Sequence, residues 1–134
     1  MFTFSSNSTI KKLVINISPD QMDCCVYKIP CKDCDKYYIG QTGKDLAKRI
    51  KQHKYSVRTG QVSNALFIHL RDNNHCIDWS NASSIVSCHD ILNRNIIESS
   101  LIKQSESQLI NMSSGMYKLD SFICNKVHRQ IQNS

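Results

Sequence analysis

Two short β-rich segments on either side of a four-residue loop constrain the fold of this chain most strongly. Residues 24–30 (CCVYKIP) and 35–41 (DKYYIGQ) are rich in β-branched and aromatic side chains, and a proline ends the first segment. The loop between them, residues 31–34 (CKDC), has a length typical of a β-hairpin connection. The sequence therefore predicts an antiparallel hairpin that begins near residue 24.

Helical patterns and one further strand follow the hairpin. Thr42 and Asp45 form a capping box for a helix expected over residues 44–59. A second helix is expected from Ser63, as its N-cap, to residue 72, where asparagines that can adopt the left-handed conformation end it. The remaining predicted elements are a strand over residues 83–89 and helices over residues 93–107 and 119–132. The order β-β-α-α-β-α predicts a mixed α/β (α+β) fold, a small three-stranded sheet with helices packed on it.

The size and charge of the chain indicate its domain organisation and the kind of partner it binds. Its 134 residues suit one domain, which we expect over residues 22–132, preceded by a loose N-terminal segment over residues 1–21. No stretch approaches the about 20 apolar residues of a membrane span, and we expect no membrane partner. The start of the chain lacks a secretory pattern, so the seven cysteines are expected to stay reduced inside the cell. The net charge of +6 indicates a polyanionic partner.

The first predicted helix has an apolar face and a basic face. The inward stripe at helical spacing consists of Leu46, Ile50, His53 and Val57. The basic residues that we consider as DNA-binding candidates are Lys44, Lys48, Lys51 and Arg58. A solvated lysine face is the alternative interpretation. Arg49 borders the apolar stripe, and a half-buried arginine needs an anionic partner, which is either an internal carboxylate or a phosphate.

The hairpin and the helix together resemble a known family. Cys25-Val26-Tyr27 and Tyr38-Ile39-Gly40, with ten residues between them, resemble the paired motif of the GIY-YIG nucleases. Cys25 stands where the first motif has glycine, and because a strand accepts a small residue we expect the fold to be kept. The further positions that fit this family are Gln41, Thr42, Arg49, His53, Glu98 and Asn111. The resemblance covers about residues 24–115.

The resemblance implies a catalytic site for phosphodiester hydrolysis. Its residues are Tyr27, Tyr38, Arg49, His53, Glu98 and Asn111. Tyr27 would help to deprotonate the nucleophilic water, with Arg49 and His53 shifting its pKa. Glu98 would bind Mg²⁺ (or Mn²⁺), and Asn111 would orient groups near the metal or phosphate. Taken alone, Glu98 has the alternative of pairing with Arg94 one helical turn earlier.

Four further residues predict a second metal site. Cys31 and Cys34 have the CxxC spacing that lets two thiolates bind one Zn²⁺. His69 and His75 can join them if the second helix ends near residue 73, because the chain can then return toward the helix. The alternatives are a reduced CxxC in a turn with two surface histidines, or Cys76 as a substitute ligand. The other cysteines are expected to be buried apolar residues: Cys24, Cys25, Cys88 and Cys124.

The Cys-Cys-His-His set looks like that of the GIY-YIG endonuclease domain of Penelope-like retroelements. This resemblance implies a metal-dependent DNA endonuclease, a nickase that primes target-site reverse transcription, with structural zinc. The expected partners are DNA and a reverse transcriptase in the same polyprotein, and we expect a monomer or weak dimer in the nucleus. The alternatives are a zinc-stabilised nucleic-acid-binding module without catalysis, and a repair or restriction enzyme of the same superfamily.

Overall fold

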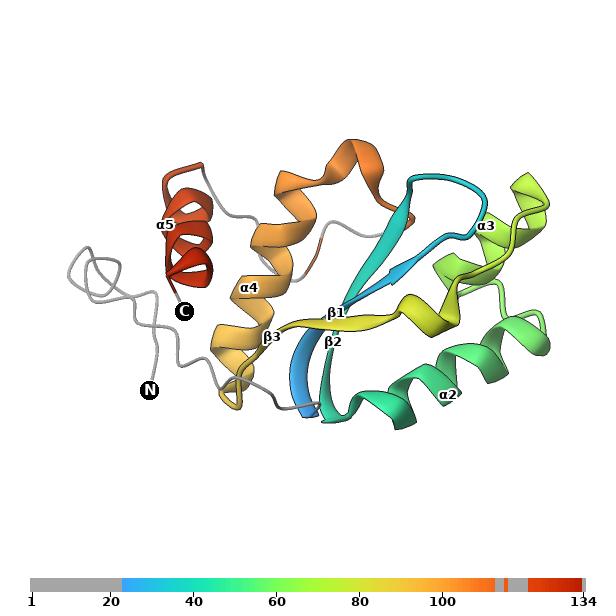
Figure 1. The fold of residues 1–134 in the computed structure, drawn as a ribbon, viewed down its shortest axis with the longest axis horizontal. Coiled ribbons are helices and arrows are strands. Elements are labelled where there is room, and N and C mark those ends of the chain that lie inside the picture. Colours follow the sequence, from blue (N-terminus) through green and yellow to red (C-terminus); the bar gives the residue numbers. More distant parts are fainter. Residues whose placement is uncertain (1–22, 113–114, 116–120, 134) are drawn as a thin grey trace.

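The computed structural model describes residues 23–112, 115 and 121–133, and it confirms the expected order of elements. Figure 1 shows the sheet in the middle of the molecule, with helices on either side of it. The strands are β1 (Asp23–Pro30), β2 (Tyr37–Asp45) and β3 (Ser83–Ser87). The helices are α2 (Leu46–Arg58), α3 (Ala65–Asn73), α4 (Ile91–Gln104) and α5 (Ser121–Gln132), with short 3₁₀ turns at Trp79–Asn81 and Glu106–Gln108.

The sheet is antiparallel, and its central strand is β1. The strand order is β2-β1-β3, and the register places Tyr27 opposite Gly40 on β2 and opposite Ser84 on β3. A bulge at the start of β1 coincides with a positive φ of 47° at Cys24. The predicted hairpin is therefore present, and β2 forms one edge of the sheet.

Side chains of β1 alternate between two hydrophobic clusters, one on each face of the sheet. Val26 packs with Ile96, Ile97 and Val127 against α4 and α5. Cys25, Tyr27 and Ile29 point to the other face and pack with Leu46 and Leu66 of α2 and α3. Because helices cover both faces, β1 is buried on both sides, which explains its nearly continuous apolar sequence.

The first helix begins later than the sequence pattern predicted. The N-cap of α2 is Asp45, whose side chain accepts a hydrogen bond from Ala47 N, and the predicted capping box at Thr42 is wrong. Thr42 and Lys44 remain in β2, which stays paired with β1 as far as Asp45. Tertiary strand pairing therefore overrides a local helix-start signal here.

The other elements differ from the predictions at their ends. Asn64, not Ser63, caps α3, while the expected left-handed residue after that helix is confirmed at Asn74, with φ of 55°. Asp90 caps α4, which starts two residues before the predicted position 93. Residues 1–22 and 116–120 lie outside the described part, so the loose N-terminal segment and the start of the last helix stay predictions. Within the described residues, no helix combines the length and apolar character that crossing a bilayer requires.

Candidate active site and metal-binding cluster

The hairpin places two predicted tyrosines beside a glycine. The ring centroids of Tyr27 and Tyr38 lie 6.3 Å apart on one face of the sheet. A β-carbon at Gly40 would lie 2.5 Å from the hydroxyl oxygen of Tyr27 and 2.9 Å from the ring of Tyr38. Gly40 is therefore needed for steric reasons, because the phenol of Tyr27 lies directly over its backbone.

Helix α2 directs Arg49 and His53 at the Tyr27 hydroxyl. His53 Nε2 lies 2.8 Å from that oxygen, and Arg49 Nε donates to it at 3.2 Å. One helical turn separates the two residues, so both side chains leave the same face of α2. The structure thus brings three of the predicted catalytic residues into one hydrogen-bonded group.

Burial controls the charge of this group. Desolvation, together with the charge of Arg49, lowers the pKa of His53 to about 4, so the imidazole is neutral at physiological pH. Desolvation raises the pKa of Tyr27 above its usual value, while Arg49 opposes that shift through its charge and its hydrogen bond. Tyr27 is therefore a phenol in the free protein, with one cation already in place to stabilise a phenolate.

Glu98 lies on α4 and reaches β2 at Gln41. Its carboxylate accepts a hydrogen bond from the backbone of Gln41, and desolvation raises its pKa to about 7 against the opposing charges of Arg49 and Arg94. The guanidinium of Arg94 donates a hydrogen bond to the side-chain oxygen of Gln41 at 2.7 Å, and it also donates to the backbone carbonyls of Cys88 and His89. Among the described residues, Glu98 and Arg94 do not form the direct ion pair that was the alternative interpretation.

Asn111 holds the edge of the sheet. Its amide oxygen accepts from Ile39 N at 2.9 Å, and its amide nitrogen donates to Ile39 O at 2.7 Å. The preceding residue Ile110 donates to Tyr37 O, so this segment runs along the free edge of β2. Asn111 thereby supports the strand between Tyr38 and Gly40, and its contact with a metal or phosphate stays a prediction.

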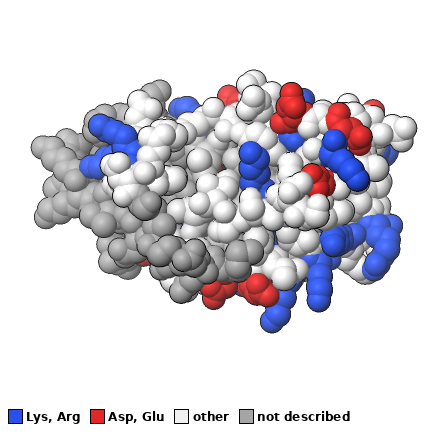
Figure 2. Space-filling model, in the orientation of Figure 1, with Lys and Arg blue, Asp and Glu red and all other residues white. Residues whose placement is uncertain are grey.

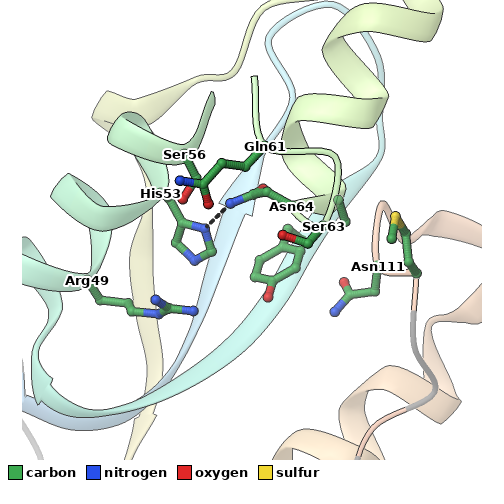
Figure 3. Close-up of a pocket in the computed structure, with 10 residues that line it drawn as sticks. Arg49, His53, Ser56, Gln61, Ser63, Asn64 and Asn111 are labelled. Carbon is green, nitrogen blue, oxygen red and sulfur yellow. Dashed lines mark hydrogen bonds between the residues drawn. The ribbon is translucent and has the colours of Figure 1, made fainter. Parts of the chain in front are cut away.

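A cavity of about 360 Å³ opens beside Arg49 and His53. Figure 3 shows both side chains pointing into it from α2, with Asn111 on the far side. Residues that the sequence analysis did not identify also line it: Ser56, Gln61, Ser63, Asn64, Ala65 and Met112. Of these, Asn64 hydrogen bonds to His53, and the only sequence signal for it was its place at the start of a helix.

The cysteine that replaces the first glycine of the motif fits its strand. Cys25 is fully buried and pairs with Thr42 on β2 and Ser87 on β3, so the fold is kept. Cys88 and Cys124 are buried as expected. Cys24 is only half-buried, and its thiol lies 3.5 Å from Gly43 O, so its predicted burial is wrong.

The four predicted ligands of the second metal site lie together: Cys31, Cys34, His69 and His75. Their ligand atoms all lie within 4.8 Å of one another. The left-handed Asn74 ends α3 and turns the chain back, so that His75 Nδ1 comes within 3.3 Å of His69 Nε2. The cluster can hold one metal ion, which would join the hairpin loop to α3.

Two features of the cluster differ from the alternatives. Both histidines are half-buried against the hairpin loop and are not free surface residues. Cys76 is exposed, and its contribution comes from its backbone: its N–H donates to Asp33 Oδ2 and its carbonyl accepts from Lys32 N. These contacts close the loop around the cluster.

The basic candidates are all exposed. Lys48, Lys51 and Arg58 lie on α2, whereas Lys44 lies at the end of β2. Figure 2 shows Lys and Arg side chains gathered along the lower right of the molecule, over α2. At about 100° per residue, Lys48, Lys51 and Arg58 lie about 100° or more around α2 from the middle of the face that lines the cavity. A polyanion bound at both would therefore extend around α2.

Comparison with known proteins supplies the family. The profile of the GIY-YIG catalytic domain matches residues 23–111, a range that contains both tyrosines, Arg49, His53 and Glu98. No curated protein and no solved structure matches the chain significantly. The matched range covers most of the described fold and ends at Asn111. This chain therefore belongs to the GIY-YIG catalytic domain family, a family of metal-dependent nucleases.

Proposed function

We propose that this domain is a DNA endonuclease that hydrolyses phosphodiester bonds with Mg²⁺ or Mn²⁺ and nicks one strand at a time. The observation that carries the proposal is the Tyr27 hydroxyl, held by Arg49 and His53 beside a cavity, with Glu98 nearby on α4. A binding module needs none of these buried polar groups, whereas phosphodiester hydrolysis needs a proton acceptor, a phosphate-binding cation and a metal ligand.

Each residue of the site has a distinct task in the proposed reaction. Tyr27 first releases its phenol proton to solvent, and the phenolate then removes a proton from the attacking water. The guanidinium of Arg49 stabilises both the phenolate and the negative phosphate. Tyr38 packs edge-on against His53, with ring centroids 5.2 Å apart, and lines the cavity. Asn111 holds the strand that carries Tyr38.

Glu98 fits the role of ligand to a hard divalent cation. Desolvation of its carboxylate raises its pKa, and among the described residues no Lys or Arg forms an ion pair with it. Mg²⁺ and Mn²⁺ prefer oxygen ligands and bind at nuclease sites through one or two carboxylates. When bound, the ion would neutralise charge that develops on the phosphate.

Zinc is the ion that we propose for the cysteine-histidine cluster. In a tetrahedral site with Zn–S of about 2.3 Å and Zn–N of about 2.0 Å, sulfur and nitrogen ligands lie about 3.5 Å apart and two nitrogens about 3.3 Å apart. The structure has Cys31 Sγ and Cys34 Sγ each 3.5 Å from a histidine nitrogen, and the two nitrogens 3.3 Å apart. With all four ligands supplied by the protein, the ion would be structural.

The biological setting is also part of the proposal. The Cys-Cys-His-His cluster supports a Penelope-like retroelement type, in which nicking primes reverse transcription of the element. One catalytic site per chain favours nicking by a monomer or weak dimer. The proposed partners are DNA and a reverse transcriptase in the same polyprotein, in the nucleus.

A plasmid assay tests the central proposal. The purified protein should convert supercoiled plasmid to the open circular form with Mg²⁺ or Mn²⁺, and it should leave the plasmid intact in EDTA. Linear product should appear only after the open circle accumulates, because one site cuts one strand. DNA binding without any cleavage in either metal would support the binding-module alternative instead.

The exposed lysines of the basic face are expected to set the salt dependence of DNA binding. Changing Lys44, Lys48 and Lys51 together to glutamine should weaken binding to unrelated sequences equally. The slope of log Kd against log salt should fall by about 0.9 for each phosphate contact that is lost. Fluorescence anisotropy with a labelled duplex, measured over a range of salt concentrations, gives this slope.

The control for this prediction is an equal loss of exposed charge elsewhere. The matched triple substitution to glutamine uses Lys32, Lys36 and Lys103, which are exposed and lie outside α2. Its slope should stay closer to that of the wild type. An unchanged slope in the Lys44, Lys48 and Lys51 variant would show that DNA binds to a different face.

A further inference from the structure

Asn64 connects the start of α3 to the catalytic histidine. Its side-chain oxygen accepts a hydrogen bond from Leu66 N at 2.9 Å and so caps the helix. Its side-chain nitrogen lies 3.2 Å from His53 Nδ1, and Figure 3 shows this contact at the edge of the cavity. One amide therefore has a structural contact on one side and a catalytic residue on the other.

The capping bond determines which way the amide faces. If the amide were turned over, its NH₂ group would meet the N–H of Leu66, and two donors would oppose each other. The oxygen must therefore face Leu66, so the NH₂ group must face His53 Nδ1. An amide NH₂ group can only donate, so Nδ1 has to be the acceptor and carries no hydrogen.

An unprotonated Nδ1 settles the hydrogen-bond direction at the other ring nitrogen. Burial lowers the pKa of His53 to about 4, so the ring is neutral and holds a single N–H, at Nε2. That N–H points at the Tyr27 hydroxyl oxygen 2.8 Å away. Arg49 Nε donates to the same oxygen at 3.2 Å.

We propose that Asn64 is a positioning residue that holds His53 as the Nε2–H tautomer, so that the Tyr27 oxygen accepts hydrogen bonds from both His53 and Arg49. The proposal rests on the nuclease function proposed above and deepens it. His53 is then a donor to Tyr27 and does not take the tyrosine proton. Two N–H donors on one oxygen favour the phenolate that would accept a proton from water.

Asn64→Asp separates this role from helix capping. Aspartate is as good an N-cap as asparagine, so the melting temperature should change by less than about 3 °C. The carboxylate can only accept, so the single proton of the neutral His53 ring should move, by exchange with solvent, from Nε2 to Nδ1. Nε2 then carries no hydrogen and cannot donate to the Tyr27 oxygen. We therefore expect kcat to fall by about 100-fold, with little change in KM.

The primary measurement is the position of the histidine proton in the 134-residue chain. Nitrogen-15 NMR distinguishes Nδ1–H from Nε2–H, and the signals of His53 are those that disappear in a His53→Gln variant. The wild type should show Nε2–H, and Asn64→Asp should show a proton on Nδ1. A proton on Nδ1 in the wild type, or an unchanged tautomer and unchanged kcat in Asn64→Asp, would overturn the proposal.

Gln61→Glu is the matched control, because it makes the same amide-to-carboxylate change on another residue of the cavity wall. Its His53 tautomer should match the wild type, and an equal change in this variant would reject the direct role of Asn64. The NMR result does not require cleavage activity. If the tautomers behave as expected but the wild type cleaves no DNA, the positioning of His53 stands and only the nuclease proposal fails.

Discussion

Replacing Glu98 with alanine is expected to abolish metal-dependent nicking while DNA binding stays nearly unchanged. Glu98 is close enough to Arg49 to interact with its charge, and it lies on α4, whereas the lysines of the basic face lie on α2 and at the end of β2. A catalytic metal ion contributes several kcal/mol of transition-state stabilisation. Because about 1.4 kcal/mol corresponds to a tenfold change in rate, the loss should be about 1,000-fold or more.

Two further variants sharpen this prediction. Glu98→Gln keeps the volume of the side chain and an oxygen that can accept from Gln41 N, so its equal inactivity would assign the effect to the lost charge. Glu106→Ala removes an exposed acid just after α4 and should cleave at the wild-type rate. Nicking rates and anisotropy titrations measure both quantities. Wild-type cleavage by a folded Glu98→Ala protein would refute the assignment of the metal ligand.

Loss of the cysteine-histidine cluster is expected to have the largest effect on stability. Cys31 belongs to the loop that joins β1 to β2, and its thiol lies 3.5 Å from His75 Nδ1 beyond α3. Structural zinc binds with about 10 kcal/mol or more in small domains. If about a third of this binding free energy contributes to the free energy of unfolding, Cys31→Ser should lower the melting temperature by about 10 °C or more.

The same change should also reduce activity, although the cluster is not part of the catalytic site. Without the ion, the hairpin loop is no longer held to α3, and the strands that carry Tyr27 and Tyr38 lose that support. Elemental analysis and thermal melts should therefore show zinc and stability lost together in Cys31→Ser. Glu98→Ala should keep both.

Cys76→Ser provides the matched control for the cluster. Its thiol is exposed next to His75, and the contacts that close the loop come from its backbone, which the substitution keeps. This variant should retain zinc and melt near the wild-type temperature. If wild-type protein purified under reducing, chelator-free conditions holds no zinc, the structural-metal proposal is wrong and the CxxC is a turn.

The sequence alone predicted the features that depend on local pattern. The hairpin, the order of the elements and the i, i+4 placement of Arg49 and His53 follow from strand and helix periodicity. The resemblance to the family added Glu98 and Asn111, which lie far from the hairpin in the chain. The CxxC spacing predicted that Cys31 and Cys34 can share an ion, and the resemblance added His69 and His75 to the cluster.

Only the tertiary structure decided what each polar group contacts. The pairing of β2 with β1 kept Thr42 and Lys44 in a strand, although their local sequence favours a helix start. The position of the Tyr27 phenol over β2 made Gly40 sterically necessary, and the approach of α3 to α2 gave Asn64 a second partner in His53. These contacts join residues from different elements, and their distances depend on how the sheet and helices pack. The hydrophobic pattern of the sequence predicts which face of a helix or strand a residue occupies. The packing of the elements determines which atoms that residue contacts.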